Sequence, residues 1–193
     1  MTGLKVCIMT ILLTLIYLTS SVFVSTIIFN HNATGSLIKS NNKIIGSKLI
    51  GQEFTSPLYF HNRPSINNYK NNISGNTNYG YYSKKLVDDI KRNYTNHKIK
   101  NFNATPDLNL ISESASGLDP DITYEGALSQ VERISKLSGT NKNELIKLLD
   151  KKAKPLACGI LGQKIINVLE LNLELKQTYA KTHWSRRIIK TNS

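Results

Sequence analysis

The sequence predicts one α+β or mixed α/β soluble domain behind a single N-terminal transmembrane helix. Three observations predict this fold class: one long uncharged apolar run near the N-terminus, about 160 residues after it, and helix and strand patterns mixed within those residues. The 193 residues are 40% hydrophobic and 20% charged, which is close to an ordinary globular composition. This composition excludes a wholly disordered chain, and a single apolar run excludes a multi-span membrane protein.

The membrane helix is predicted over residues 6–29, which contain no charge, proline or glycine. About 24 residues form a helix of roughly 36 Å, whereas a hydrocarbon core is about 30 Å thick. A secretory signal peptide is the alternative, but its apolar core has about 7–15 residues and ends at a small-x-small cleavage site. Residues 27–31 (IIFNH) offer no such site. We therefore expect residues 1–30 to be a retained anchor.

Hydroxyl side chains recur along one face of this helix. Their spacings of three and four residues place them together, at Thr10, Thr14, Tyr17, Ser21 and Ser25. Small and hydroxyl residues allow membrane helices to approach closely and to hydrogen-bond across the contact. Each hydroxyl can equally donate to a backbone carbonyl one turn earlier. The sequence therefore predicts that Thr10, Thr14, Ser21 and Ser25 pack on a partner helix, with backbone bonding as the alternative.

Charge and cysteine content carry little information on topology. The chain has 25 Lys+Arg against 13 Asp+Glu, a formal net charge of +12. The lysines that flank the apolar run are Lys5 on one side and Lys39, Lys43 and Lys48 on the other. By the positive-inside rule this small excess favours a cytoplasmic C-terminal domain. Cys7 and Cys158 are not expected to pair, and two cysteines are too few for a disulfide-built scaffold.

Strands and long polar connections are expected in the chain that follows the anchor. The strand candidates are residues 44–54, 108–114 and 165–169. Residues 62–82 and 93–107 are dense in Asn and poor in aliphatic side chains, so we expect both to be connecting segments.

Two helices are marked by caps and by one apolar face. Thr123 is the expected N-cap of the first, which ends near Gly139. Asn141, with Glu144 three residues later, gives the second a start that resembles a capping box, and Pro155 stops it.

The other segments have weaker patterns. A third helix is expected over residues 83–91, and residues 167–175 fit either a strand or a helix. The C-terminal tail, residues 177–193, carries several basic side chains around Trp184. Such a tail can lie on an anionic membrane surface, although a solvated or frayed end is the commoner outcome.

Motifs typical of catalysis are weak in this sequence. The four histidines are scattered without the spacing of a zinc site, and no Gly-rich phosphate loop ending in Lys-Ser/Thr is present. Ser116 sits in a Ser/Gly/Asp cluster that lacks the leading glycine of a nucleophile elbow, so a turn before a helix is the expected role. A hydrolase using Ser116 with His61 and an anchored binding protein for polyanions are the alternatives that composition and motifs leave open.

Several sequence blocks, taken in order, resemble a known family. The blocks are GSLI (35–38), GSKLIGQEF (46–54), YFHNRPS (59–65), SASGLDPDI (114–122), QVERI (130–134), LGQ (161–163) and NVLELNLEL (167–175). Behind one N-terminal membrane helix, they are similar to the C subunit of the Kdp-type potassium-transporting ATPases, the KdpC family. The resemblance covers residues 1 to about 176.

The resemblance implies a non-catalytic subunit of a high-affinity, ATP-driven potassium uptake pump in the cell membrane. The implied partners are a potassium-binding channel-like subunit, an ATP-hydrolysing P-type subunit, a small single-span subunit and membrane lipid, with no nucleic acid. The partner subunits are implied to handle ATP and potassium, so no cofactor is assigned to this chain. The family is described as needed for assembly and as a catalytic chaperone that raises the ATP affinity of the P-type subunit.

The resemblance also implies a domain plan and a side of the membrane. Residues 1–30 are the anchor, 31–176 the KdpC-like domain and 177–193 the basic tail. The domain is implied to lie on the outer face, which opposes the weak charge bias. Glu144 stands where the family has a glutamine linked to nucleotide binding, and a carboxylate would repel phosphates, so we assign it no contact with ATP.

No catalytic or metal-binding residue is predicted. Residues in or near the family blocks are candidates for docking or for ordering loops, with structural support as an equal alternative for each. They are Arg63, Ser114, Ser116, Asp119, Gln130, Arg133 and Asn167.

Overall fold

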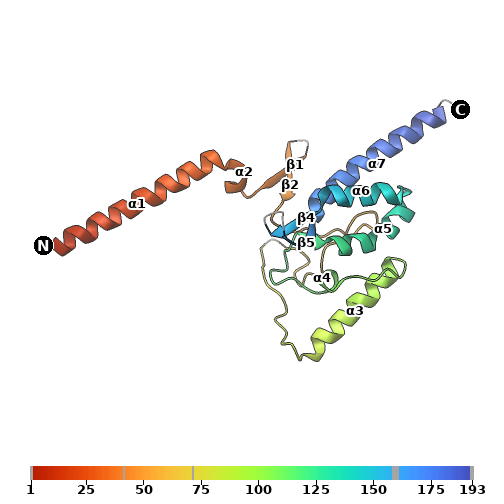
Figure 1. Ribbon diagram of the computed structural model, residues 1–193, viewed down its shortest axis with the longest axis horizontal. Coiled ribbons are helices and arrows are strands. Elements are labelled where there is room, and N and C mark those ends of the chain that lie inside the picture. Colours follow the sequence, from red (N-terminus) through yellow and green to blue (C-terminus); the bar gives the residue numbers. More distant parts are fainter. Residues whose placement is uncertain (1, 41, 71, 158–160, 192–193) are drawn as a thin grey trace. The chain divides into compact units, whose positions relative to one another are not determined.

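The computed structural model describes residues 2–40, 42–70, 72–157 and 161–191, and the chain divides into two compact units, residues 1–47 and 48–193 (Figure 1). The predicted α+β fold behind one apolar N-terminal helix is confirmed.

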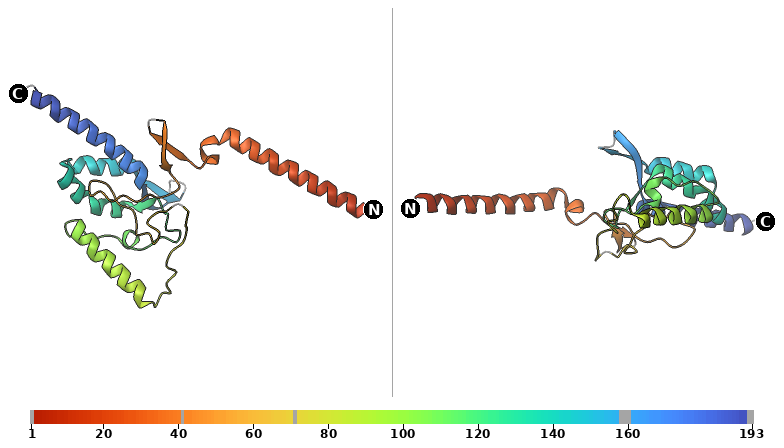
Figure 2. Two further views of the ribbon diagram at one scale, coloured as in Figure 1. Left: turned by 180° about the vertical axis from the view of Figure 1, so that it is seen from behind. Right: turned by 90° about the horizontal axis from the view of Figure 1, so that it is seen from below.

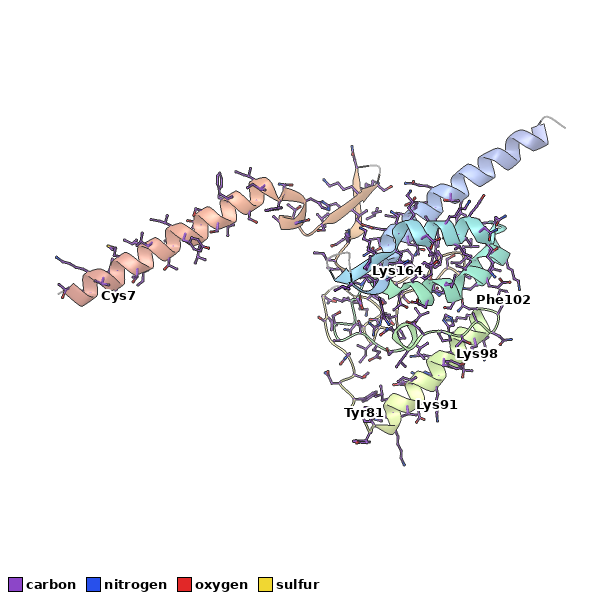
Figure 3. All side chains as sticks on the ribbon, viewed as in Figure 1. Cys7, Tyr81, Lys91, Lys98, Phe102 and Lys164 are labelled. Carbon is purple, nitrogen blue, oxygen red and sulfur yellow. The ribbon has the colours of Figure 1, made fainter. Side chains whose placement is uncertain are left out.

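The first unit contains the apolar helix and a small hairpin. Helix α1 (Thr2–Ile28) is long and apolar enough to cross a membrane, and none of its residues is buried. A short helix α2 (Asn30–Ala33) follows, and then strands β1 (Leu37–Ser40) and β2 (Lys43–Ser47) pair antiparallel. Cys7 lies exposed on α1 (Figure 3), whereas Cys158 lies outside the described residues.

The second unit combines a small sheet with helices. In chain order its elements are α3 (Lys84–Lys100), α4 (Leu108–Ile111), β3 (Asp121–Thr123), α5 (Tyr124–Ser138), α6 (Lys142–Lys152), β4 (Lys154–Ala157), β5 (Leu161–Asn167) and α7 (Val168–Thr191). The sheet has the order β3-β5-β4, and both pairings are antiparallel. Helices α5, α6 and α7 lie together in all views, whereas α3 lies along the other side of α5 (Figure 2).

The core forms where the apolar faces of α5, α6 and α7 meet β5 and one irregular segment. Its fully buried members include Phe60, Ile134, Leu149, Ile166 and Leu171. Phe60 belongs to no helix or strand, yet none of its surface is exposed. The core therefore needs the chain around residue 60 to be held in place by something other than strand pairing.

The helix caps predicted for α5 and α6 are confirmed. The Thr123 hydroxyl accepts from the Gly126 N–H at 3.0 Å, and Gly139 ends α5 with a φ of 68°. The Asn141 side chain caps α6, but it accepts from the N–H of Asn143 at 2.8 Å instead of forming the expected box with Glu144. Helix α6 ends at Lys152, before Pro155, which lies in β4.

One strand prediction is wrong, and a second is right only in its first part. Residues 108–114 begin with the short helix α4, because the Asp107 carboxylate accepts from the Leu110 N–H at 3.0 Å and closes a helical turn. The strand expected over 44–54 ends at Ser47. Beyond it the chain is irregular, and Gly51 passes so close to Tyr69 that a Cβ would lie 2.5 Å from the Tyr69 ring.

The extents of several segments also differ from prediction. Helix α3 runs to Lys100, through the first part of the expected connection at 93–107, because the Asn93 side chain donates to the Ile111 carbonyl at 3.0 Å and ties that part of the helix to α4. The strand expected at 165–169 is the end of β5, and residues from Val168 onward are helical. The backbone of the basic tail continues α7 as far as Thr191.

Candidate functional site

An irregular segment, residues 57–63, is held by side chains that replace a neighbouring strand; we call it the strap. The side-chain amide of Asn172, on α7, accepts from the Phe60 N–H at 2.9 Å and donates to the Phe60 carbonyl at 2.9 Å. Gln130, on α5, does the same for His61, at 2.8 and 3.0 Å. Each amide forms the pair of bonds that one residue of an antiparallel strand would form. The strap is thereby fixed without belonging to a sheet.

Arg133 is the third residue that holds the strap. Its guanidinium donates to the carbonyls of Pro57 and Tyr59, to Asn101 Oδ1 at 2.8 Å and to Gln130 Oε1 at 2.9 Å. All four acceptors are uncharged, and the residue is only 2% exposed. Burial lowers the pKa of Arg133 to about 10, because the charged form loses hydration.

Arg63 connects the end of the strap to the loop at residues 112–120. It forms an ion pair with Asp119 at 3.0 Å and donates to the carbonyls of Ser112 and Glu113 at 3.2 and 3.1 Å. Asp119 also accepts from the Asp121 N–H at 3.0 Å, at the start of β3. Arg63 and Asp119 therefore set the position of a loop that enters the sheet.

The two serines predicted as candidates lie in the same loop and differ in their bonding. The Ser116 hydroxyl accepts from the Leu118 N–H at 3.1 Å, which closes a local turn. Ser114 is 5% exposed, and within the described part of the chain its hydroxyl has no hydrogen-bond partner. Gly117 permits the turn, with a φ of 66° and the Gly75 carbonyl only 2.6 Å from where a Cβ would stand.

Asn167 lies at the junction of β5 and α7. Its side-chain oxygen accepts from the Glu170 N–H at 3.1 Å, and its nitrogen donates to the Lys48 carbonyl at 2.9 Å and to Asp121 Oδ1 at 3.2 Å. Burial raises the pKa of Asp121, and the bond from Asn167 opposes that shift. Asn167 therefore caps α7 and connects three segments of the second unit.

The structure thus divides the seven candidates into groups. Gln130 and Arg133 hold the strap, and Asn167 joins β5 to α7; the other candidates lie in or against the 112–120 loop. Sequence reasoning missed Asn172, which stands next to leucines on the buried face of α7 and is 3% exposed. A lone amide on an apolar helical face is the signal that could have revealed it.

The hydroxyls of α1 show the backbone bonding that was the alternative to partner packing. Thr10 donates to the Cys7 carbonyl at 2.8 Å, Thr14 to the Thr10 carbonyl at 2.8 Å and Ser21 to the Tyr17 carbonyl at 2.7 Å. Ser25 lies exposed farther along the helix. A hydroxyl oxygen that donates one bond keeps lone pairs, so these bonds leave the packing prediction in place.

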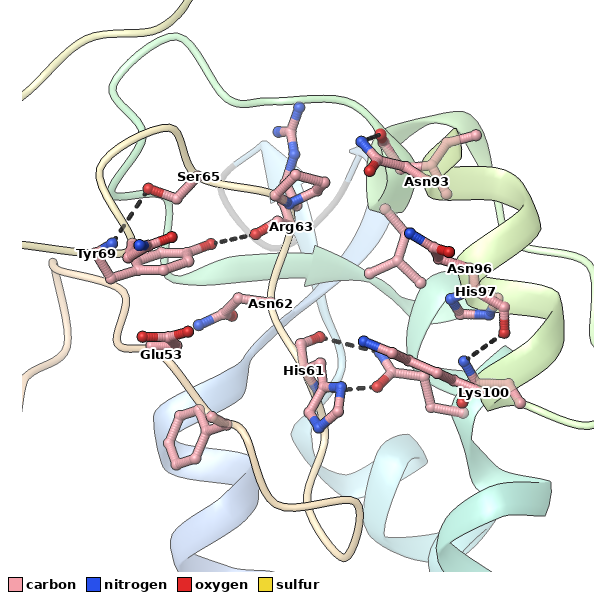
Figure 4. A pocket seen from close by; sticks show the side chains of 17 residues that line it. Glu53, His61, Asn62, Arg63, Ser65, Tyr69, Asn93, Asn96, His97 and Lys100 are labelled. Atoms are coloured by element: carbon pink, nitrogen blue, oxygen red, sulfur yellow. Dashed lines mark hydrogen bonds between the residues drawn. The ribbon is translucent and has the colours of Figure 1, made fainter. Parts of the chain in front are cut away.

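A cavity of about 360 Å³ lies between the strap and α3 (Figure 4). His61 and Asn62 line it from the strap, and Asn96, His97 and Lys100 line it from α3. The scattered histidines of the sequence are therefore brought together in part. Burial, and secondly the charge of Arg133, lowers the pKa of His97 to about 4 and also lowers that of His61.

Comparison with known proteins identifies the family. The model of the family described as "KdpC: K+-transporting ATPase, c chain" matches residues 2–177. The chain belongs to the KdpC family. The proteins called "Potassium-transporting ATPase KdpC subunit" from Koribacter versatilis and Bacillus cereus (strain Q1) are 38% and 41% identical to it, over 171 and 155 residues. These matches cover 88% and 78% of this chain, and 89% and 80% of the respective relatives.

A third KdpC subunit, from Rhodopseudomonas palustris (strain BisB18), is 38% identical over 181 residues, which cover 86% of this chain and 91% of the relative. The family match extends from the beginning of α1 into α7. This KdpC chain is therefore a membrane-associated subunit with one candidate spanning helix among the residues that the structure describes. The strap and the 112–120 loop lie inside the matched range.

Proposed function

We propose that this chain is a non-catalytic accessory subunit of an ATP-driven potassium uptake complex. The observation that carries the proposal is the single family match over residues 2–177, which includes both the apolar helix and the folded second unit. The relatives are named as KdpC subunits of potassium-transporting ATPases. We infer the same partners for this chain: a potassium-binding channel-like subunit, a P-type subunit that hydrolyses ATP and a small single-span subunit.

We assign each segment of the chain the role that its physical character suits. Residues 1–30 anchor the chain, and the hydroxyl face of α1 packs on a partner helix. Residues 31–176 form the docking domain on the outer face, and residues 177–193 add a basic extension. ATP and potassium are handled by the partners. On this topology, any effect on the ATP affinity of the P-type subunit is a coupling transmitted through the membrane subunits.

The bonding of the candidate side chains supports an accessory role over the hydrolase alternative. Ser116 accepts from a main-chain N–H in its own turn, and the His61 ring lies 3.0 Å from the Ser56 carbonyl. A carbonyl only accepts, so His61 Nε2 carries a hydrogen there. Ser116 and His61 line different cavities, and each is engaged with main chain. These contacts therefore fit two residues that order loops better than they fit a catalytic nucleophile and its general base.

A shallow groove at the 112–120 loop is our candidate for the contact with the channel-like subunit. Four of the predicted residues line it, Arg63, Ser114, Ser116 and Asp119, and its apolar wall contains Leu49, Ile50 and Leu118. Leu49 is 61% exposed. An exposed apolar wall beside a buried hydroxyl suits a partner segment that supplies both apolar contact and a hydrogen bond.

The test is co-purification from membranes through a C-terminal tag, together with potassium-stimulated ATPase activity. We expect the channel-like and P-type subunits to co-elute with the intact chain, and deletion of residues 1–30 to abolish co-elution. The groove is tested separately with Leu49→Asp, which should weaken co-elution. The matched control is Ile99→Asp, because Ile99 is 74% exposed on α3 and lies outside the groove.

These outcomes separate the two claims. If the intact chain elutes alone and ATPase activity does not depend on it, the subunit proposal is wrong. If the complex forms but Leu49→Asp and Ile99→Asp leave it equally intact, the subunit proposal stands and the groove is not the contact.

A further inference from the structure

The cavity between the strap and α3 is built like a ligand site. Its volume of about 360 Å³ lies in the range of roughly 300–1,000 Å³ that small-molecule sites occupy. Its wall joins apolar groups, among them Phe54, Leu110 and Ile111, to amide, imidazole and amino groups. Figure 4 shows His97 and Lys100 of α3 on the side that faces His61 of the strap. Polar side chains therefore line the cavity from both the strap and α3.

The charges around this cavity are not balanced. Arg133 does not line the cavity, but it donates to two residues that do, Asn101 and Gln130. Its four acceptors are all neutral, and in the described part of the chain it has no carboxylate at ion-pair distance. Lys100 lines the cavity itself. Arg63 also lines it, but that charge is matched by Asp119. A buried charge without a counter-charge is costly, and an anion beside it recovers part of that cost.

The acidic groups nearby do not offset these cations. Glu53 and Lys100 both line the cavity and are both exposed, so solvent screens these two opposite charges alike. Asp107 acts on His97, but it caps α4 and accepts from the Thr123 hydroxyl at 2.6 Å, and its effect on His97 is smaller than that of Arg133. The charged groups acting on His61 are Arg133 and Lys100, both positive. The charge that is left without a counter-charge beside the cavity is therefore that of the buried Arg133.

We propose that this cavity binds a small oxyanion, a phosphate, sulfate or carboxylate group, with the Lys100 ammonium as its cationic contact and the two imidazoles as further contacts once they are protonated. The inference is independent of the partners proposed above, since it rests on the second unit alone. A bound oxyanion would act as the counter-charge of Arg133. It would also favour the imidazolium forms of His61 and His97, so binding should strengthen as the pH falls.

The probe for the test is inorganic sulfate, whose charge stays constant over the pH range in which histidines titrate. The full chain in detergent, labelled at its histidines, is titrated with sulfate at constant ionic strength, with sodium chloride as the reference. We expect sulfate, but not chloride, to raise the apparent pKa of His97 from about 4 and to bind more tightly at pH 5 than at pH 8. Inorganic phosphate and the same chain in nanodiscs of anionic phospholipid then show whether a free oxyanion or a lipid phosphate is the better source.

Two variants that each remove one positive charge, at Lys100 and at Lys98, locate the site. Lys100→Met should weaken sulfate binding about tenfold, because it removes a charge-assisted contact, and Lys100→Arg should restore most of it. Lys98→Met is the control, since Lys98 lies over the Tyr94 ring and does not line the cavity. Equal responses to sulfate and chloride, or equal losses in the Lys98 and Lys100 variants, would overturn the proposal.

Discussion

The strap and the segment at residues 76–82, which we call the tyrosine loop, are both irregular but are ordered in different ways. The strap is fixed by side chains from two helices, Gln130 and Arg133 on α5 and Asn172 on α7. The tyrosine loop bonds through the Thr77 N–H to Glu113 at 3.2 Å, and its Tyr82 is 94% exposed. An irregular segment of this protein is therefore fixed where buried polar side chains form the hydrogen bonds that a neighbouring strand would otherwise form.

This difference has an energetic consequence. Phe60 can enter the core only if its N–H and carbonyl are bonded, because a buried polar group without a partner costs about 1–3 kcal/mol. Asn172 satisfies both groups at 2.9 Å. In the tyrosine loop, water can bond the exposed main chain. The hydrogen bonds within the protein therefore contribute less to the free energy of unfolding there. We expect substitutions in the two regions to differ accordingly.

The largest effect is expected for Arg133→Met. The substitution removes every bond from the guanidinium and leaves the half-buried Tyr59 carbonyl and the buried Asn101 Oδ1 without this donor. We expect a loss of about 3–5 kcal/mol in the free energy of unfolding, as for other broken buried polar networks. The measurement is urea unfolding of the full chain in detergent, followed by circular dichroism.

Arg92→Met is the matched control for that variant. Arg92 lies on α3 with a side chain 66% exposed and pairs with Asp89 one turn earlier. Its loss should cost less than about 0.5 kcal/mol. If the two variants were equally stable, the strap would not depend on Arg133, and the contrast between strap and tyrosine loop would fail.

An intermediate effect is expected from acid, because the strap region contains two histidines whose pKa values lie below the usual 6.5. The folded state of such a group binds fewer protons than the unfolded state, so its contribution is present above pH 6.5 and is lost as the pH falls toward about 4. Allowing for partial solvent exposure, we expect His97 to account for about 1–2 kcal/mol of this loss.

The variant His97→Gln tests this sign and its source. Glutamine keeps a polar group near the Ser129 hydroxyl, which lies 3.1 Å from the His97 ring, but it does not titrate. The slope of unfolding free energy against pH between 6.5 and 4 should therefore become flatter. A slope that is unchanged, or a stability that rises with acid, would show that His97 does not titrate as the burial of its ring requires.

Local signals in the sequence were enough to predict some elements. Thr123 and Gly139 bound α5 as predicted, because a hydroxyl cap and a left-handed glycine act through neighbouring residues only. The apolar run gives α1 for the same local reason. Residues 108–114 show the limit: their aliphatic content resembles a strand, but Asp107 accepts from Leu110 and starts a helical turn.

The strap could not be predicted because its order comes from distant parts of the chain. Gln130 and Asn172 reach it across 69 and 112 residues of sequence. Gln130 and Arg133 were candidates for loop order or docking, but no local pattern shows which carbonyls they bind. The cavity was missed for a similar reason, since His61 and His97 come together only when α3 packs near the strap. Polar side chains at core positions of helices are the signal for such contacts.

The smallest effect is expected for Tyr82→Ser in the tyrosine loop. The Tyr82 ring meets the ring of Tyr81 edge-on, with centroids 5.1 Å apart, but both rings are exposed. Their contact excludes little water, so the substitution should change the free energy of unfolding by less than about 0.5 kcal/mol. Tyr59→Ser in the strap is the control, because Tyr59 packs on Phe54 and Tyr179 at the edge of the core and should cost about 2–3 kcal/mol. Equal losses would mean that the tyrosine loop is held as firmly as the strap, and that side-chain bonding from helices is not what separates them.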